Sequence, residues 1–156
     1  MNDQEQDAPS HDLARAAKLV PHVRLVATRL LELRSGFVPS TVVPEPPYTI
    51  KIEASFAWVR RDDGFSYSFK VEVNAGPEDH IEVPFWTCVT AQELTYLVKD
   101  VKNFADEDAA AFGNSSGLMA AWPYLREVVQ SISTRSGLAP VILDVIRFSL
   151  VAPQDA

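Results

Sequence analysis

The sequence predicts an α+β fold in which a four-stranded antiparallel sheet carries helices on one face. Apolar and polar residues alternate with the period of a half-buried strand over residues 48–58, 65–73 and 81–89. The apolar period becomes that of an amphipathic helix over residues 118–132. Between the first two expected strands, residues 37–48 contain four prolines and cannot join a central ladder, so they must cross over the sheet in a Greek-key connection.

The chain before the sheet is expected to hold a loose tail and one short helix. Residues 1–9 have no bulky side chain after Met1 and are predicted to be a disordered tail, so that residues 10–156 form a single domain. Ser10 can cap a helix of two to three turns, and Pro21 ends it.

Residues 22–36 admit two interpretations. Helix propensity favours a helix, whereas apolar alternation favours a long strand. We favour the strand because Pro21 breaks any helix that continues from the preceding segment. Its expected apolar face consists of Val23, Leu25, Ala27, Leu31 and Leu33.

The next two strands are expected to form a hairpin that turns at Asp63 and Gly64. An Asp-Gly pair is typical of a two-residue type I′ turn, which needs positive φ angles. In that register Trp58 pairs with Phe69, and the apolar residues of both strands share one face.

The fourth strand and the following segments are less regular. In the strand at residues 81–89, Trp86 falls on the outer face, where a second protomer could cover it. After Gln92 the alternation is lost, which indicates a brief helical or irregular segment. Residues 106–112 are expected to be helical until Gly113 interrupts them.

The last helix is predicted to run from about Trp122 to Ser136. Pro123 suits a first helical turn, where its missing N–H has no partner, and Gly137 is a stop signal. Its apolar stripe consists of Leu118, Trp122, Leu125, Val128, Val129 and Ile132.

Composition excludes several functional classes. The 156 residues carry 14 basic and 21 acidic side chains, and this net charge of −7 disfavours binding to nucleic acid or anionic membranes. No segment approaches the ~20 apolar residues of a membrane span, and no signal peptide is apparent, so we expect a cytoplasmic protein. Cys88, the single cysteine, is expected to be a packed thiol.

The sequence offers no pattern for catalysis or for a cofactor. His11, His22 and His80 lie in three separate segments without the spacing of a zinc site. No phosphate-binding glycine loop or nucleophile motif is present, so we predict neither an enzyme nor a bound metal.

Apolar residues are more numerous than one core face can bury. Two segments outside the expected sheet and helices are rich in them, and they need a second protomer or a client polypeptide as cover. The apolar segments are the crossover (Phe37, Val38, Val42, Val43, Tyr48) and the final run (Val145, Ile146, Phe148, Leu150, Val151).

The rival hypothesis is a small-molecule-binding α+β domain with a pocket between sheet and helix, lined by Trp58, Tyr67 and Trp122.

Ten residues near the C-terminus resemble the C-terminal signature of the SecB chaperone family. The run Pro-Tyr-x-Arg-Glu is followed by a helix that ends Thr-Arg-x-Gly, and then by Pro-x-x-Leu and an apolar run ending in Phe. The matching residues are Pro123, Tyr124, Arg126, Glu127, Thr134, Arg135, Gly137, Pro140, Leu143 and Phe148.

The resemblance implies a SecB-like fold, assembly as a tetramer that is a dimer of dimers, and binding of unfolded polypeptides without ATP or any cofactor. Family members bind such clients in apolar grooves formed by the crossover and the last helix. By position, the client-binding residues here would be Phe37, Val38, Val42, Val43, Tyr48, Val145, Ile146, Phe148 and Val151.

One departure from the family concerns its role in protein transport. SecB proteins that dock on the translocation motor carry an acidic pattern on the first strand, where this chain has Arg-Leu-Leu-Glu-Leu at residues 29–33. The chain therefore looks more similar to the SecB-like branch of dedicated chaperones, some of which act beside toxin–antitoxin pairs. An antitoxin and an exported preprotein both remain candidate clients.

Overall fold

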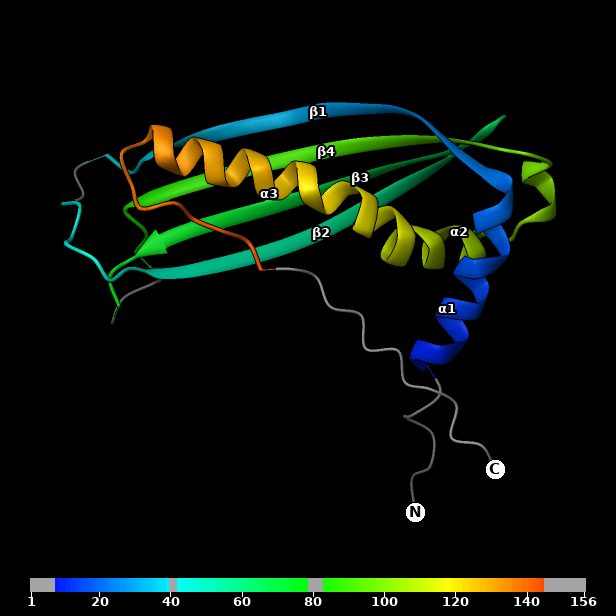
Figure 1. Ribbon diagram of the computed structural model, residues 1–156, viewed down its shortest axis with the longest axis horizontal. Coiled ribbons are helices and arrows are strands. Elements are labelled where there is room, and N and C mark those ends of the chain that lie inside the picture. The colour runs from blue at the N-terminus through cyan, green and yellow to red at the C-terminus, as the bar shows by residue number, and fades with distance from the viewer. Residues whose placement is uncertain (1–7, 40–41, 79–82, 145–156) are drawn as a thin grey trace, which may run out of the picture.

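The computed structural model describes residues 8–39, 42–78 and 83–144 as an antiparallel four-stranded sheet with helices on one face (Figure 1). The strand order is β1-β4-β3-β2, so the two edge strands are those that the proline-rich crossover connects, as in a Greek key. This confirms the predicted fold class. The strands are β1 (Val23–Phe37), β2 (Thr49–Arg61), β3 (Gly64–Gly76) and β4 (Trp86–Val98).

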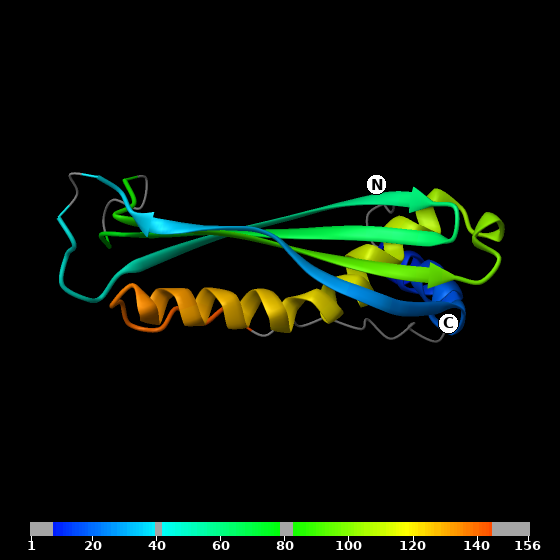
Figure 2. The same ribbon diagram turned by 90° about the horizontal axis from the view of Figure 1, so that it is seen from above.

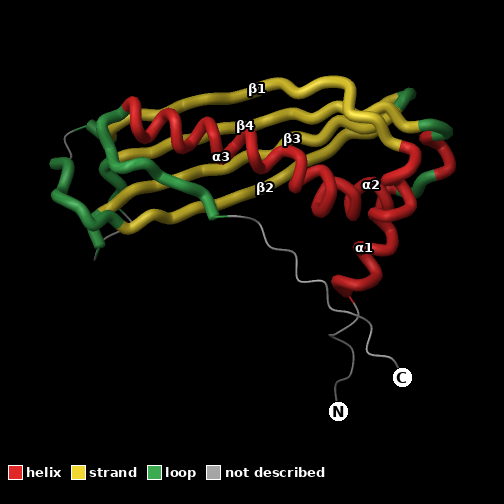
Figure 3. The backbone as a smooth tube through the Cα atoms, in the orientation of Figure 1, coloured by secondary structure: helices red, strands yellow, loops and turns green. Residues whose placement is uncertain are grey.

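The helices gather on one side of the sheet. The long helix α3 (Leu118–Arg135) runs along the face, while α1 (Ala8–Leu19) and α2 (Asp106–Phe112) pack on each other at one end (Figures 1 and 2). Short 3₁₀ turns at Val20–His22 and Val101–Asn103 connect helix and strand. A π-helical turn at Gly113–Gly117 joins α2 directly to α3, as the backbone trace shows (Figure 3).

The core lies between the helices and the two central strands. Alternate residues of β3 and β4 point to the helices and lose nearly all exposure, and aromatic rings dominate the β3 face. Such large side chains supply most of the area buried on folding. The largest fully buried ones are Trp86, Tyr67, Phe65, Phe69, Phe85, Leu19, Leu94, Leu125 and Leu143.

The strand interpretation of the segment after Pro21 is confirmed, but its predicted apolar face is wrong in part. Register shifts between Leu25 and Ala27 and between Leu30 and Glu32 mark β-bulges. Each bulge changes the phase of the alternation, so Ala27 pairs with Thr95 on the helix-free face. The helix side of β1 instead carries Val23, Leu25, Thr28, Leu30, Leu33, Ser35 and Phe37.

The predicted hairpin register is wrong by two residues. Arg61 pairs with Gly64, so the turn residues are Asp62 and Asp63, and Trp58 pairs with Tyr67 rather than with Phe69. Within the described chain, the positive φ angles belong to Asp100 and Gly137, so this turn is not of type I′. A shift of two residues leaves every side chain on its predicted face, which is why alternation could not detect it.

The fourth strand departs most from expectation. It begins at Trp86 and continues to Val98, where a helical or irregular segment was expected after Gln92. Trp86 faces the chain's own core, is fully buried, and donates from Nε1 to Ser136 Oγ at 3.2 Å. No second protomer is therefore needed to cover this ring.

The final helix also begins earlier than predicted. Gly113 does not interrupt the helix, because the chain absorbs the glycines in a π turn, and Pro123 lies inside α3 rather than in its first turn. An added Cβ on Gly113 would lie 2.5 Å from Tyr67 Cε1, and one on Gly117 3.1 Å from Phe69 Cζ. The two glycines let the helix pass close to the aromatic face of β3.

The first helix begins at Ala8, two residues before the predicted cap at Ser10, and residues 1–7 lie outside the described chain. Ala16 and Leu19 are buried beside α2. Lys18 Nζ lies 3.4 Å from Asp108 Oδ1, and this ion pair links the two helices.

Candidate functional site

The helix α3 covers only the middle of the sheet. Its inward stripe, Ala121, Leu125, Val129 and Ser133, is buried mainly against β4 and β3. Four strands at a spacing of about 4.8 Å are wider than one helix of about 10 Å, so the sheet extends beyond α3 on both sides. The helix-facing sides of the edge strands are therefore left partly open.

On one flank, a hollow of about 90 Å³ lies between α3 and β2. Phe56 stacks on Phe69 with ring centroids 5.9 Å apart, and 36% of Phe56 remains exposed. Asn114 of the π turn belongs to the lining. We call this hollow the β2 groove, and it is lined by Ala54, Ser55, Phe56, Phe69, Lys70, Val71, Asn114, Leu118, Trp122 and Leu125.

The chain after α3 returns beside the helix toward this groove. Gly137, with φ of 79°, reverses the direction, and the Val141 N–H then donates to Ser133 Oγ at 2.9 Å (Figure 1). Leu138, Val141 and Leu143 are buried along this return.

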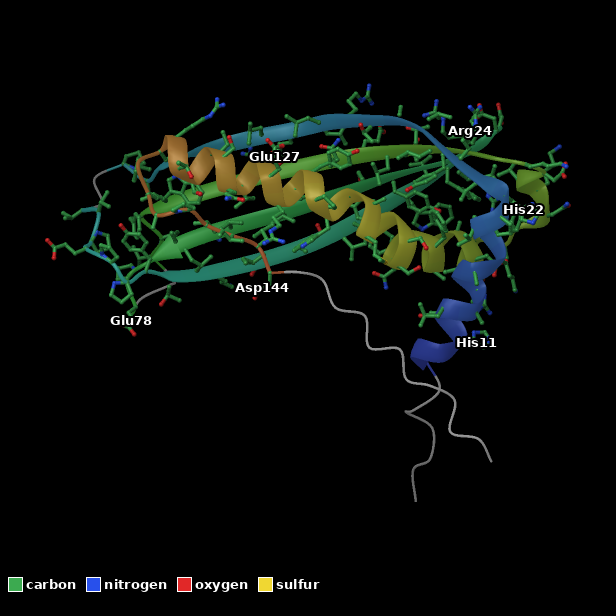
Figure 4. All side chains as sticks on the ribbon, in the orientation of Figure 1. His11, His22, Arg24, Glu78, Glu127 and Asp144 are labelled. Atoms are coloured by element: carbon green, nitrogen blue, oxygen red, sulfur yellow. The ribbon has the colours of Figure 1, made fainter. Side chains whose placement is uncertain are left out.

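The described chain ends at the groove wall. Trp122 Nε1 donates to the carbonyl oxygen of Asp144 at 2.8 Å, and Trp122 also lines the β2 groove. Figure 4 labels Asp144 at this point, beside β2. The indole thus ties Asp144, the last residue that the structure describes here, to α3.

On the other flank, β1 exposes an apolar strip. Leu25, Leu30, Leu33 and Phe37 all point to the helix side of the sheet, yet each keeps between 40% and 47% of its surface exposed. We call these four residues the β1 strip. The outer edge of β1 pairs with no other strand of the described chain, so its backbone N–H and C=O groups are available to another chain.

The predicted client-binding residues of the crossover have different environments. Phe37 belongs to the β1 strip, and Val42 and Val43 are 88% and 45% exposed. Val38 is half-buried and its N–H donates to the Phe85 carbonyl at 2.9 Å. Tyr48 packs edge-on against Phe85 with centroids 5.1 Å apart and is half-buried, so it also supports the core.

The remaining predicted client-binding residues, Val145, Ile146, Phe148 and Val151, lie outside the described residues. Their assignment to client binding therefore stays a prediction.

Of the three residues of the rival small-molecule pocket, Trp122 lines the β2 groove, whereas Trp58 and Tyr67 do not belong to its lining. Tyr67 is fully buried and donates its hydroxyl to the Ala109 carbonyl at 2.8 Å, so its polar group is already satisfied. Trp58 packs against Phe65 and Tyr67, while Trp122 lies at the β2 groove.

Titratable groups in the core favour their neutral forms. Burial raises the pKa of Tyr67, and burial together with Tyr124 raises the pKa of Tyr96. Burial likewise raises the pKa of Cys88, which makes its thiol a poor nucleophile. Among the described residues, no three of His, Cys, Asp and Glu gather as metal ligands; His11 and His22 lie apart on α1 and in the turn before β1 (Figure 4).

The two flanks of α3 cannot be identified from the sequence. The strand and helix periods place Phe56, Leu118 and Trp122 on apolar faces, but nothing in a single sequence says which faces the helix leaves open. The exposed leucines of β1 carried a signal, namely their number within one strand, but only the strand order shows that β1 is an edge.

Comparison with solved structures identifies the fold. A Mycobacterium tuberculosis protein, the Rv1957 SecB-like chaperone in complex with a ChAD peptide from the Rv1956 HigA1 antitoxin, matches with a TM-score of 0.75 at 17% sequence identity. The match covers 88% of this chain and 99% of the mycobacterial chain. This chain has the SecB-like fold.

Other comparisons add little to the SecB-like fold. A Streptococcus agalactiae protein of unknown function matches with a TM-score of 0.38 at 9% identity, over 79% of this chain and 97% of that one, which is too distant to support an argument. Neither protein-family models nor curated protein sequences match the chain.

Within the described residues, no helix is both long and apolar enough to cross a lipid bilayer.

Proposed function

We propose that this protein is an ATP-independent holdase that binds unfolded or aggregation-prone polypeptide segments. The observation that carries this proposal is the pair of open apolar surfaces on either side of α3. Monomeric soluble proteins rarely expose contiguous apolar surface of this kind without a binding partner.

The β2 groove is the proposed client site. An extended client strand alongside β2 could hydrogen-bond to the open edge of this strand, because β2 is the other edge of the sheet. An apolar client side chain would then enter the hollow beside Phe56 and Trp122. Backbone pairing and apolar burial at ~25 cal/mol per Å² tolerate many client sequences.

The crossover and the final apolar run are proposed to extend this site. Val42 and Val43 expose their side chains on a stiff connection, so they can contact a client at little entropic cost. The residues Val145, Ile146, Phe148 and Val151 follow Asp144, which Trp122 holds at the groove wall.

The β1 strip is proposed to lie between copies of this chain in a tetramer. Strand pairing between two β1 edges would satisfy the open backbone groups, and the strip would be removed from water. This leaves the β2 groove on the opposite edge free for clients.

We propose a cytoplasmic antitoxin as the first client class to test. The similar mycobacterial structure holds an antitoxin peptide, and residues 29–33 here carry one acidic side chain, Glu32, where motor-docking SecB proteins have an acidic pattern. An exported preprotein is the alternative client. Comparing the binding of an unfolded antitoxin with that of an unfolded preprotein distinguishes the two client classes.

The direct test is the affinity for a permanently unfolded protein, such as a reduced and carboxymethylated one with a fluorescent label, in the absence of nucleotide. We expect micromolar or tighter binding by the parent and about tenfold weaker binding by Phe56→Ala, which is about 1.4 kcal/mol. Val59→Ala is the matched control, since Val59 is 64% exposed on the helix-free face of the same strand. Absence of binding by the parent would exclude the proposal, and equal loss in both variants would place the site elsewhere.

A further inference from the structure

The residues of β2 alternate in the direction of their backbone groups as well as of their side chains. Arg61 and Gly64 close a two-residue turn, so their backbones hydrogen-bond to each other, and every second residue of β2 before Arg61 bonds to β3 in the same way. The residues between them turn their N–H and C=O groups to the outer edge, which pairs with no other strand of the described chain. These outward-bonding residues include Ile52, Ala54, Phe56 and Trp58.

The outward-bonding residues are also those whose side chains face α3. Ala54 pairs with Val71 and Phe56 with Phe69, and both β3 partners are buried on the helix side. A client strand that adds to this edge in the antiparallel sense would place one residue directly opposite Ala54, bonded through its own N–H and C=O, with its side chain on the groove side. The client residues that hydrogen-bond to β2 are therefore the ones whose side chains enter the groove.

Ala54 is the small residue in this row. Its neighbours on the same face, Ile52 and Phe56, are 42% and 36% exposed and fill the space over β2 on either side. Ala54 lines the hollow of about 90 Å³, and Leu118 and Trp122 of α3 form the opposite wall. Pockets for whole small molecules measure roughly 300–1,000 Å³, so this hollow suits one large apolar side chain instead.

We propose that Ala54 determines which clients the β2 groove accepts, namely segments that pair antiparallel with β2, carry an apolar residue at every second position and place a large one opposite Ala54. This inference rests on the proposed function, because it names the class of client for the same groove. The described sheet is antiparallel throughout, and antiparallel pairs are the more stable per residue. Segments that form half-buried strands in folded proteins have this period of two, whereas amphipathic helices do not.

The first test uses the full-length protein and short labelled peptides in which Val alternates with Thr and the central residue is either Phe or Ala. Fluorescence anisotropy should show that the parent binds the Phe peptide at least about tenfold more tightly than the Ala peptide. Ala54→Leu fills the hollow and should reduce this preference to about twofold or less. Ala57→Leu, on the helix-free face of the same strand, is the matched control and should keep the preference of the parent. Melting curves verify that both variants are folded.

The second test needs no variant of the protein. A methyl group on the backbone nitrogen of the central Phe removes the N–H that bonds to β2 and should weaken binding by the parent at least about tenfold. The same methyl group on a neighbouring Thr, whose N–H points away from β2, should change the affinity by about twofold at most.

Three results would overturn the inference. They are an equal Phe preference in the parent and Ala54→Leu, an equal loss of that preference in Ala57→Leu, and a Thr methylation that weakens binding as much as Phe methylation or more. The unfolded, carboxymethylated protein is measured beside the peptides. If the parent binds it while one of these results is obtained, only the client class is excluded, whereas failure to bind it excludes the proposed function as well.

Discussion

At the scale of single residues, the close approach of a neighbouring strand's backbone decides which side chain is tolerated at Gly64. Gly64 begins β3 opposite Leu97, and an added Cβ there would lie far inside contact distance of the Tyr96 carbonyl oxygen. The sequence pattern assigned this glycine to a turn with positive φ. The structure instead requires it because a neighbouring strand leaves no room for a side chain.

Gly64→Val should therefore lower the free energy of unfolding by about 1–3 kcal/mol, as overpacking does. Gly36→Val is the control, since nothing lies within 4 Å of a Cβ at Gly36. Urea denaturation of both variants measures the difference. Equal stability of the two variants would show that β3 and β4 do not approach as described.

Tyr67 should make the protein sensitive to alkaline pH. Burial raises the pKa of Tyr67 in the folded state above the value of about 10 in the unfolded chain, so folding favours the protonated phenol. The stabilisation is complete below pH 10 and is lost as pH rises from there toward the folded pKa. Tyr67→Phe should lose about 1 kcal/mol at pH 7 with the hydrogen bond to Ala109, and should show a shallower decline above pH 10.

Melting temperatures of the parent and Tyr67→Phe at pH 7 to 11 measure both effects. Tyr96 shares the core and also has a raised pKa, so some alkaline decline should remain in the variant. Parallel curves for the two proteins would mean that Tyr67 ionises as an exposed tyrosine does.

At the scale of elements, alternation predicted which segments are strands but not where each one starts or pairs. A bulge in β1 moves Ala27 to the face opposite to the predicted one. In the hairpin, the register differs by two residues from the predicted one, which leaves every side chain on its predicted face. The second half of β4, residues 93–98, was missed because polar Gln92 lies on the helix-facing side and apolar Leu97 on the helix-free face, which breaks the alternation. In α3, the π turn hid the continuity with α2, since glycine commonly ends a helix.

Local sequence predicts exposed residues of the candidate site mainly in the crossover. Exposed Val42 and Val43 follow from the four prolines around them, which local sequence reveals. The β2 groove and the β1 strip depend on how wide the sheet is relative to α3. The width of the sheet relative to α3 depends on tertiary structure, so no local sequence pattern reveals it.

Replacing Val42 and Val43 with Ser should weaken client binding several-fold and leave the melting temperature within about 1 °C. Surface loop residues contribute little to the core, and both side chains are exposed. The control is Val59→Ser with Val83→Ser, which removes two other exposed valines, at 64% and 62%. Client affinity that is the same in both double variants would remove the crossover from the proposed site.

At the scale of the whole molecule, the two edges of the sheet are proposed to have different partners. The β1 edge carries four half-exposed apolar residues on one face, which suits a permanent interface, whereas the β2 edge borders a small groove, which suits exchange. The similar mycobacterial chain is matched over 99% of its length, so the same sheet and helix layers are available to both proteins.

Light scattering should give about four times the 17.3 kDa mass of the chain. Leu30→Glu in the β1 strip should reduce that mass, because a carboxylate there would be buried between copies without a partner. Val59→Glu, on the helix-free face, is the matched control and should leave the mass unchanged. A monomeric parent at micromolar concentration would contradict assembly through β1.

If this SecB-like fold keeps unfolded chains soluble without ATP, the protein should suppress the aggregation of a client. A heat-denatured client is followed by light scattering with the parent protein at increasing ratios, with and without ATP. We predict that aggregation falls to near zero at about one tetramer per client, equally with and without the nucleotide, and that Phe56→Ala needs a several-fold higher ratio. Undiminished aggregation in the presence of a folded parent protein would contradict the account.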